Sequence, residues 1–313
     1  MNKEDDIRLD QKVRAAWMYY IAGLNQSEIA SQLGTSRPVV QRLIAAAKDE
    51  GIVSIGLHHP VANCLDYAQL LKEKYQLTDC NIMPVYSIES TLDSVTFGCY
   101  QLMARYLQGD KPTIVGIGSG LTLKKTIKRI DFDSQNTRCV ALISAMNEHG
   151  QCNYYDDVPL LLARKIQGKY YQWPAPRYAQ SREEYQMWST NRLFRNVSTV
   201  ARDSDVIFVG IGALGRQSPI FKDGFIDEQQ LEELTARGSV GEILGRFIDA
   251  EGNVVESQIN QMITSHDIRE SNCPRIAAAC GEDKRPAILA ALKGGWINGL
   301  VTDEHTARWL LTR

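Results

Sequence analysis

The sequence of 313 residues predicts an α/β protein in two parts, a small helical domain over residues 1–59 and a larger α/β domain over residues 60–313. Two patterns support this division. Apolar residues recur at helical spacing between residues 11 and 49, and beyond residue 80 short apolar runs alternate with helical segments. Because these runs are apolar throughout, they predict strands buried on both faces. The larger domain should therefore be Rossmann-like, with a mainly parallel sheet covered by helices.

Residues 26–53 predict a helix-turn-helix, in which two short helices cross and the second enters a DNA major groove. Gly34 stands where the chain must turn, and Pro38 suits the first turn of the second helix because its missing N–H costs little there. The expected inner faces are apolar: Ile29, Ala30 and Leu33, then Val40, Leu43 and Ile44. A supporting helix over residues 11–22 should bury Val13, Trp17, Tyr20 and Ile21, and residues 52–57 should follow as a short strand or wing.

The outward side chains of this motif are types that bind phosphates and base edges. The predicted contacts with operator double-stranded DNA are Gln26, Ser27, Ser36, Arg37, Pro38, Gln41 and Arg42. Residues 7–48 hold six basic and two acidic residues, a local charge of +4. So small a charge neutralises few phosphates, so a homo-oligomer, dimer or tetramer, is expected to act on DNA. The alternative interpretation is an αα-hairpin inside an ordinary helical core.

Composition excludes several other classes of protein. The whole chain carries a net charge of −2, and its seven cysteines form no CxxC pair, so neither a metal site nor a cofactor is expected. The polar, acidic first residues do not resemble a signal peptide, and no uncharged apolar run is long enough to span a bilayer. We therefore expect a cytoplasmic protein with reduced thiols and no membrane partner.

In the larger domain, a helix with an apolar stripe over residues 63–75 should either pack on the domain or form a dimer contact. Strands are predicted over residues 81–86, 113–118, 139–144, 205–212, 276–279 and 297–302. Helices are predicted over residues 91–107, from 121, and over 158–167, 228–237, 284–293 and 304–311. A small hairpin should turn at Gly252. Ligands bind such sheets at the carboxyl ends of the strands, where the loops 116–122, 210–216 and 303 fall.

A glycine-rich turn after the strand at 113–118 is the first candidate binding element. Gly116, Gly118 and Gly120 would let a ligand approach the backbone, while free N–H groups and the hydroxyls of Ser119 and Thr122 favour a phosphate or carboxylate. The alternative is a tight turn that needs glycine for its conformation alone. The turn lacks the third glycine of the dinucleotide fingerprint and the lysine-serine pair of a P-loop.

Three charged residues could join this turn at the mouth of the sheet. Lys284 can reach an anionic ligand or remain solvated beside acidic neighbours, and the sequence leaves both interpretations open. Glu242 lies among glycines and apolar residues, where binding and structural roles compete evenly. Asp303 can cap the last helix or bind sugar hydroxyls, and capping is favoured.

Several stretches together resemble SorC-type sugar-responsive transcriptional regulators. They are SEIASQLGTSRPVVQRLIAAAKDEGIVSI, VGIGSGLTL, DVIFVGIGALG, the segment 174–176, GSVGEILGRFIDAEGNVV and AACGEDKRPAILAALKGGWINGLVTDEHTARWLL. The resemblance implies an effector domain similar to sugar-phosphate isomerases and glucosamine-phosphate deaminases that binds a sugar or sugar phosphate without catalysis. It also implies dimers or tetramers whose operator affinity changes with the effector, which we expect to be related to sorbose or sorbitol.

The resemblance assigns roles to the candidate residues of this chain. The turn at 116–122 would hold phosphate or one end of the sugar, Glu242 would contact hydroxyls, and Lys284 would reach the anionic end. Two departures from the family pattern bear on the ligand. Cys280-Gly281 stands where paired glycines are usual, and Ala145-Met146 stands where another glycine pair is usual. Both loops should line the effector mouth, so a free ketose or polyol is also a candidate.

Two rival functions remain at this stage. One is a sugar-phosphate isomerase or aminosugar-phosphate deaminase with an N-terminal helical appendage, in which Glu242 or Asp303 would serve as the general base. The helix-turn-helix argues against it, because an isomerase has no use for a surface that reads DNA. The other is a scaffold whose larger domain only assembles.

Overall fold

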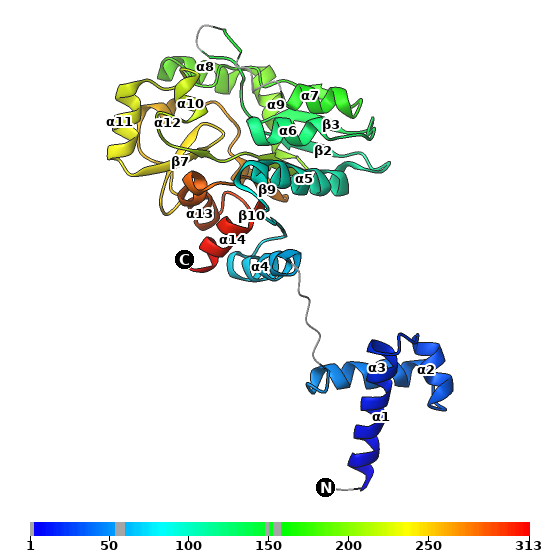
Figure 1. The fold of residues 1–313 in the computed structure, drawn as a ribbon. Coiled ribbons are helices and arrows are strands. Elements are labelled where there is room, and N and C mark those ends of the chain that lie inside the picture. Colours follow the sequence, from blue (N-terminus) through cyan, green and yellow to red (C-terminus); the bar gives the residue numbers. More distant parts are fainter. Residues whose placement is uncertain (1–2, 54–59, 148–149, 153–157) are drawn as a thin grey trace. The chain divides into compact units, whose positions relative to one another are not determined.

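The computed structural model describes residues 3–53, 60–147, 150–152 and 158–313 (Figure 1). The chain forms two compact units, Met1–His59 and Pro60–Arg313, which we call the N-terminal unit and the C-terminal unit. Each has its own buried apolar cluster, so each is described separately below.

The described part of the N-terminal unit contains the helices α1 (Lys3–Tyr20), α2 (Gln26–Gln32) and α3 (Arg37–Asp49). Asn25 caps α2, because its side chain accepts hydrogen bonds from the backbone N–H of Ser27 and Glu28, and the Glu28 carboxylate accepts one from the N–H of Asn25 (2.7 Å). Gly34 adopts φ +63° in the turn between α2 and α3, a conformation that favours glycine. Ser36 precedes α3 without a side-chain cap.

The core of the N-terminal unit consists of small and branched side chains where the helices cross: Ala15, Ile29, Ala30, Val40 and Ile44. Leu33 and Leu43 pack against its edge. The helix predicted over residues 11–22 in fact begins at Lys3, and its predicted inner face is wrong. The structure buries Ala15 and Ala16 and leaves Val13, Trp17 and Ile21 exposed. Small alanines let α1 approach its neighbours closely, and periodicity cannot tell such a face from a larger apolar one. Ile52 and Val53 form no strand, and residues 54–57 of the predicted wing lie outside the described residues.

Seven parallel strands form the main sheet of the C-terminal unit. Across the sheet their order is β1 (Asp79–Met83), β10 (Gly299–Asp303), β9 (Arg275–Ala278), β5 (Val206–Val209), β2 (Ile114–Ile117), β3 (Arg138–Ala141) and β4 (Lys169–Tyr171). The predicted α/β class with a mainly parallel sheet is therefore confirmed. The chain runs outward from β2 through β3 to β4 and then returns to β5 on the other side of β2. This reversal opens a crevice at the carboxyl ends of β2 and β5.

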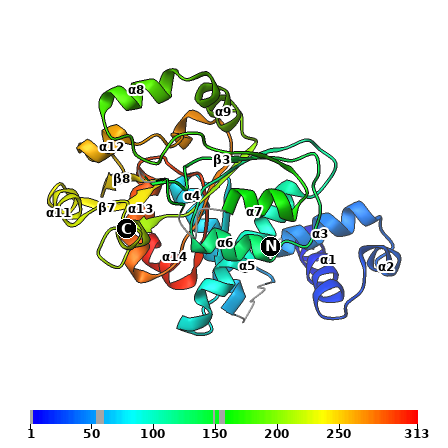
Figure 2. The same ribbon diagram turned by 90° about the horizontal axis from the view of Figure 1, so that it is seen from above.

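Helices cover both faces of this sheet (Figures 1 and 2). One apolar cluster joins the sheet to α5 (Ile88–Leu107), α6 (Leu121–Lys128) and α7 (Val158–Lys165). A second joins the other face to α4 (Pro60–Tyr75), α9 (Arg192–Arg202), α13 (Arg285–Lys293) and α14 (Glu304–Leu311). Successive side chains of β5 point to opposite faces of the sheet, so Phe208 packs in the first cluster while Ile207 and Val209 pack in the second.

A smaller antiparallel sheet lies beside the crevice and contains β6 (Gly212–Ala213), β7 (Ser239–Ile243) and β8 (Arg246–Asp249). The predicted hairpin around Gly252 is present in short form, since Ile248 pairs antiparallel with Val254 and the N–H of Val255 donates to the Phe247 carbonyl (3.0 Å). The main partner of β8 is β7, a pairing that the sequence did not indicate. The tight turn is Leu244-Gly245, where both residues have positive φ (51° and 79°). Such a two-residue turn matches the twist of a hairpin, but Leu at its first position gives little sequence signal.

The C-terminal unit also contains several short helices and turns, of which the sequence predicted α11 and did not predict the others. They are α8 (Arg182–Thr190), α10 (Pro219–Lys222), α11 (Glu228–Ala236), α12 (Gln258–Met262), and the 3-10 turns η1 (Ile268–Glu270) and η2 (Glu282–Lys284). In α8 none of the side chains is buried, so no apolar stripe marks the helix.

Candidate functional site

A cavity of about 550 Å³ lies at the crevice between β2 and β5. Its wall includes five of the residues predicted from the sequence: Ser119, Gly120, Thr122, Glu242 and Lys284. They come from the turn before α6, from β7 and from the turn before α13, which are far apart in the chain. The parallel sheet brings them together because each of these loops follows or covers the carboxyl end of a strand.

The turn that precedes α6 presents polar groups to the cavity. Gly120 is the N-cap residue of α6, with φ +116°, a conformation that side chains other than that of glycine rarely adopt. A Cβ there would meet only open space, so conformation rather than crowding requires the glycine. The first N–H groups of α6 have no intrahelical acceptors, and the hydroxyls of Ser119 and Thr122 lie beside them. This end of the cavity can therefore hold an anion.

The first two glycines of the predicted motif do not line the cavity. A Cβ on Gly116 would come within 2.9 Å of Ile207 and 3.0 Å of Leu142, and one on Gly118 within 3.0 Å of Leu244. These two positions are glycine because β2 packs closely against its neighbours. The prediction that they approach the ligand therefore needs correction, since their role is in packing.

Glu242 and Lys284 bring opposite charges to the cavity wall. The Glu242 carboxylate accepts a hydrogen bond from the N–H of Gly245 (2.7 Å) and lies so close to Gly212 that a Cβ there would collide with it. Lys284 is half-buried, and no described residue forms a hydrogen bond or ion pair with its ammonium group. A half-buried cation without a protein counter-ion is costly, so it suits a site that is completed by an anionic ligand.

Asp303 lies outside the cavity wall and has a structural role. Its buried carboxylate accepts hydrogen bonds from the N–H (2.9 Å) and hydroxyl (2.6 Å) of Thr306, which caps α14. It also accepts one from the N–H of Gly281 (3.2 Å). Asp303 therefore fixes the loop that leads to Lys284 and has the capping role that the sequence favoured, whereas the direct effector contact predicted for it finds no support, because Asp303 does not line the cavity.

Arg177 is the main residue of the cavity that sequence patterns missed. It is buried, its guanidinium lies 3.5 Å from the ring centre of Phe225, and its Nε and Nη2 donate to the carbonyl of Ser144 (3.3 and 3.2 Å). It also borders a second, polar cavity of about 320 Å³, so the two cavities share this side chain. Its only signal in the sequence was its place after the proline pair at 174–176, which indicates a rigid connection.

Of the two loops that depart from the family pattern, the one at Cys280-Gly281 lines the cavity and the one at Ala145-Met146 does not. Cys280 lines the cavity, and burial raises the pKa of its thiol to about 11, so the thiol stays neutral. Ala145 and Met146 do not line the cavity. The Met146 carbonyl instead accepts a hydrogen bond from the N–H of Arg177 (3.1 Å). One loop therefore contributes a side chain and the other positions a neighbour.

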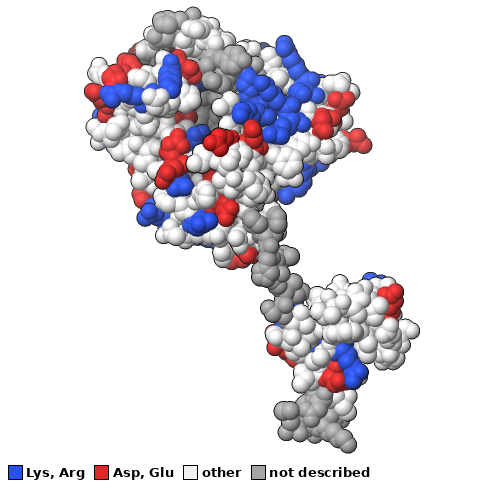
Figure 3. Space-filling view, viewed as in Figure 1, with Lys and Arg blue, Asp and Glu red and all other residues white. Residues whose placement is uncertain are grey.

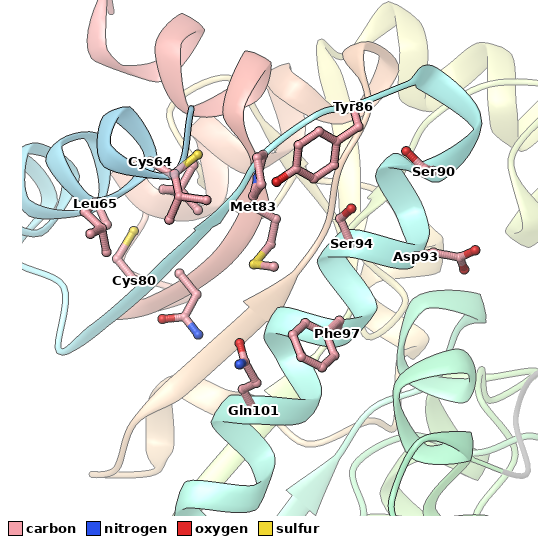
Figure 4. Close-up of a pocket in the computed structure, with 15 residues that line it drawn as sticks. Cys64, Leu65, Cys80, Met83, Tyr86, Ser90, Asp93, Ser94, Phe97 and Gln101 are labelled. Atoms are coloured by element: carbon pink, nitrogen blue, oxygen red, sulfur yellow. The ribbon is translucent and has the colours of Figure 1, made fainter. Parts of the chain in front are cut away.

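An apolar groove of about 580 Å³ lies among α4, β1 and α5, away from the glycine-rich turn (Figure 4). Met83, Tyr86 and Phe97 surround it, together with Leu65 of α4. Among the described residues of its wall, Asp93 alone carries a charge. Burial raises the pKa of the neighbouring Cys64 and Cys80 thiols to about 11 and about 12, which keeps them uncharged. Polar side chains complete the wall, namely Asn81, Ser90, Ser94 and Gln101, so the groove is apolar on one part of its wall and polar on another.

Outside the cavity, the C-terminal unit has a group of basic residues at the C-terminal ends of α6 and α7. Figure 3 shows Lys and Arg gathered over the region of α6 and α7. The last turns of these helices contain Lys125, Lys128, Arg164 and Lys165. Positive charge at a helix C-terminus is stabilised by the helix dipole, so these residues need no ligand to explain them.

In the N-terminal unit, the predicted DNA contacts gather at the start of α3 and the start of α2. Those on the α3 side are exposed: Ser36, Arg37, Pro38, Gln41 and Arg42. Arg37 Nε donates to Gln26 Oε1 of α2 at 3.4 Å, and Ser27 is exposed beside it. Arg42 Nε reaches only the Pro38 carbonyl, at 3.4 Å. The structure thus links Arg37 of α3 to Gln26 of α2, and the role of these residues in DNA binding stays a prediction.

The described residues contain neither a helix that could span a membrane nor a cluster of metal ligands. None of the described helices combines the length and the apolar character that crossing a bilayer requires. Within the same part of the chain, no three His, Cys, Asp or Glu side chains gather as a metal site would need.

Comparison with known proteins decides the family. A family model described as "Putative sugar-binding domain" matches residues 59–312, which is most of the chain. The chain belongs to the family of sugar-binding transcriptional regulators of the SorC and DeoR type. It is 30% identical over 302 residues to the erythritol catabolism regulatory protein EryD of Brucella abortus (strain 2308), covering 96% of this chain and 95% of EryD.

Other members of the family are similar along almost their whole length. The transcriptional regulator LsrR of Escherichia coli (strain K12) is 31% identical over 313 residues, covering 96% of this chain and 94% of LsrR. The crystal structure of the full-length sorbitol operon regulator SorC from Klebsiella pneumoniae superposes with a TM-score of 0.71 at 26% identity, covering 98% of this chain and 99% of SorC. Sugar binding and transcription regulation are thus the functions of the family.

Proposed function

We propose that this regulator controls a carbohydrate-utilisation operon and that a sugar or sugar-phosphate effector controls its binding to operator DNA. DNA binding is assigned to residues 1–59, and effector binding and oligomerisation to residues 60–313. The observation that carries the effector assignment is the unpartnered Lys284 in the same cavity as the N-terminus of α6. A cation and free N–H groups together favour a phosphate, while Glu242 offers a carboxylate to sugar hydroxyls.

The size and polarity of the cavity support a small polyol or ketose. A volume of about 550 Å³ lies within the range of small-molecule sites. The names of EryD and SorC refer to erythritol and to sorbitol, which are both polyols. We propose an effector of this chemistry, related to sorbose or sorbitol, bound without turnover. Of the two candidate general bases for isomerisation, Asp303 lies outside the cavity wall and caps α14, whereas Glu242 lies within the wall, so a turnover assay is what separates the regulator from the enzyme.

For DNA binding, we propose that α2 and α3 form a helix-turn-helix whose second helix lies in the major groove. The exposed Arg37 and Arg42 near the start of α3 support this assignment. We also propose a dimer or tetramer. Large apolar side chains remain exposed along the groove beside α4, including Leu65 (61%) and Tyr86 (70%), and a second copy of the C-terminal unit could cover them.

A thermal-shift screen with sorbitol, sorbose, erythritol and their phosphates tests the effector assignment. A ligand at 100 times its Kd stabilises the native state by about 2.7 kcal/mol, which raises the Tm of a unit of this size by roughly 5–10 °C. Lys284→Met should raise the Kd of a phosphorylated ligand roughly 10- to 100-fold, because a hydrogen bond to a charged group is lost.

Lys293→Met is the matched control, since Lys293 lies on α13 outside the cavity and pairs with Glu251. It should leave the titration unchanged. If Lys284→Met and the wild type bind the phosphorylated ligand with the same Kd, Lys284 is not part of the effector site. Turnover of any sugar phosphate would favour the isomerase or deaminase over the regulator.

A further inference from the structure

One row of large apolar side chains on α1 stays exposed and lies outside the core of the N-terminal unit, as far as its residues are described. Leu9, Val13, Trp17 and Ile21 recur at every fourth residue and are 44%, 45%, 57% and 72% exposed. Ile21 follows the last residue of α1 but continues its helical turn, since its N–H donates to the carbonyl of Trp17 (2.9 Å). Residues four apart stack into one ridge on a helix surface. We call these four residues the α1 ridge.

The α1 ridge is not needed for the fold of the N-terminal unit. The residues of α1 that the unit buries are Ala15 and Ala16, and Met18 and Tyr20 pack at the edge of its core. The N-terminal half of α1 extends beyond α2 and α3 (Figure 1). Single exposed apolar residues are common, but a continuous ridge that includes a tryptophan is typical of an interaction surface.

We propose that the α1 ridge packs against the α1 ridge of a second copy of this chain, about a two-fold axis. Ridges formed by every fourth residue interlock when two helices cross at roughly −50°. With the helices antiparallel and the axis beside Ala15, Leu9 meets Ile21 of the other copy and Val13 meets Trp17. The ridge is therefore self-complementary, as an isologous contact must be. Asp10 and Arg14, paired and more than half exposed, provide a polar rim beside it.

The exposed area of the α1 ridge favours a second copy of this chain over a separate protein as its partner. Its four side chains expose roughly 300–400 Å² in one copy, judged from the area that apolar and aromatic side chains bury. Two ridges together bury at most roughly 800 Å², whereas stable complexes bury about 1,200–2,000 Å². A separate partner protein would need a larger surface. A second N-terminal unit does not, because an oligomer of C-terminal units holds it at an effective concentration in the millimolar range.

The contact rests on the proposed function, because it presupposes a DNA-binding oligomer. It would fix the distance between two recognition helices, since α1 packs directly on α3 in each copy. The N-terminal units would then bind two operator half-sites as one rigid pair, and the contact would strengthen binding only where both half-sites are present.

Trp17→Glu in the full-length protein tests the contact. The probes are duplexes that the wild type selects from a random-sequence pool, carrying either both half-sites or one of them alone. Trp17→Glu should lower affinity for the paired probe at least tenfold and leave affinity for the single half-site nearly unchanged. Gln11→Glu is the control, because it adds the same charge to an exposed position of α1 outside the ridge. Equal losses on both probes, or no loss, would overturn the proposal.

A second measurement does not depend on DNA. The double variant Val13→Cys, Trp17→Cys should form a covalent dimer on mild oxidation, because position 13 of one copy faces position 17 of the other. Wild type controls for Cys152, the cysteine that is exposed among the described residues. The variant Gln11→Cys should not cross-link. Absence of the dimer would overturn the contact even if DNA binding holds, and a dimer in a protein that binds no DNA would leave the contact standing while the proposed function fails.

Discussion

Lowering the pH should destabilise the C-terminal unit through one buried histidine. His266 is 4% exposed, its Nε2 lies 2.9 Å from Ser271 Oγ, and its backbone carbonyl accepts a hydrogen bond from Arg246 (3.0 Å). Burial, with Arg246 and Arg202 nearby, lowers the pKa of the imidazole from 6.5 to about 4, while Asp267 opposes the shift. The ring therefore stays neutral in the folded protein at pH values where it is protonated in the unfolded chain.

The sign and size of the effect follow from this difference in pKa. Between pH 6.5 and 4 the unfolded state binds more protons, so the free energy of unfolding falls as the pH falls and levels off below about 4. From pH 7.5 to 4.5 the loss attributable to His266 is roughly 2–3 kcal/mol. The contribution is fully present above pH 6.5, where both states hold a neutral ring.

Urea unfolding at constant ionic strength, followed between pH 7.5 and 4.5, measures this loss. His266→Asn removes the titrating group, so its free energy of unfolding should fall between pH 7.5 and 4.5 by roughly 2–3 kcal/mol less than that of the wild type. His305→Asn is the matched control, because it makes the same substitution at a histidine that is exposed on α14. Parallel curves for the wild type and His266→Asn would refute the reasoning.

Three further predictions follow from the fold and the proposed site. Arg37→Ala and Arg42→Ala should each weaken operator binding while leaving effector titration intact, as gel-shift and thermal-shift assays would show; unchanged operator affinity in both would remove α3 as the recognition helix. Asp303→Ala should lower stability by roughly 1–3 kcal/mol, because it leaves Thr306 and Gly281 N–H groups unpaired, and should also raise the effector Kd. Thr306→Ala, which keeps the bond to Gly281, should affect stability but not the Kd; equal effects on the Kd would contradict the positioning role. Asn25→Ala should cost about 1 kcal/mol of unfolding free energy in the N-terminal unit, and an unchanged melting curve would exclude a role for this cap.

Local sequence determined the elements whose chemistry lies within a few residues. The strand and turn at 113–122 could be predicted because a buried parallel strand is apolar throughout and the helix after it needs glycine at its N-cap. The start of α3 could be predicted from Gly34 and Pro38 for similar reasons. The hairpin at β7 and β8 could not, since its turn places Leu244 at positive φ, which no residue preference announces.

Some residues of the candidate site could likewise be predicted from the sequence, and others could be found only from the tertiary structure. Sequence alone indicated Ser119, Thr122, Glu242 and Lys284, because each pairs a polar or charged group with a strand end or an apolar setting. Only the tertiary structure placed Asp303 under the loop and Arg177 in the wall, since burial and hydrogen bonds between distant segments decide those roles. The same holds for α1, where periodicity shows an apolar face but cannot say whether the core lies behind it. Close packing through Ala15 and Ala16 took the other face and left the α1 ridge free.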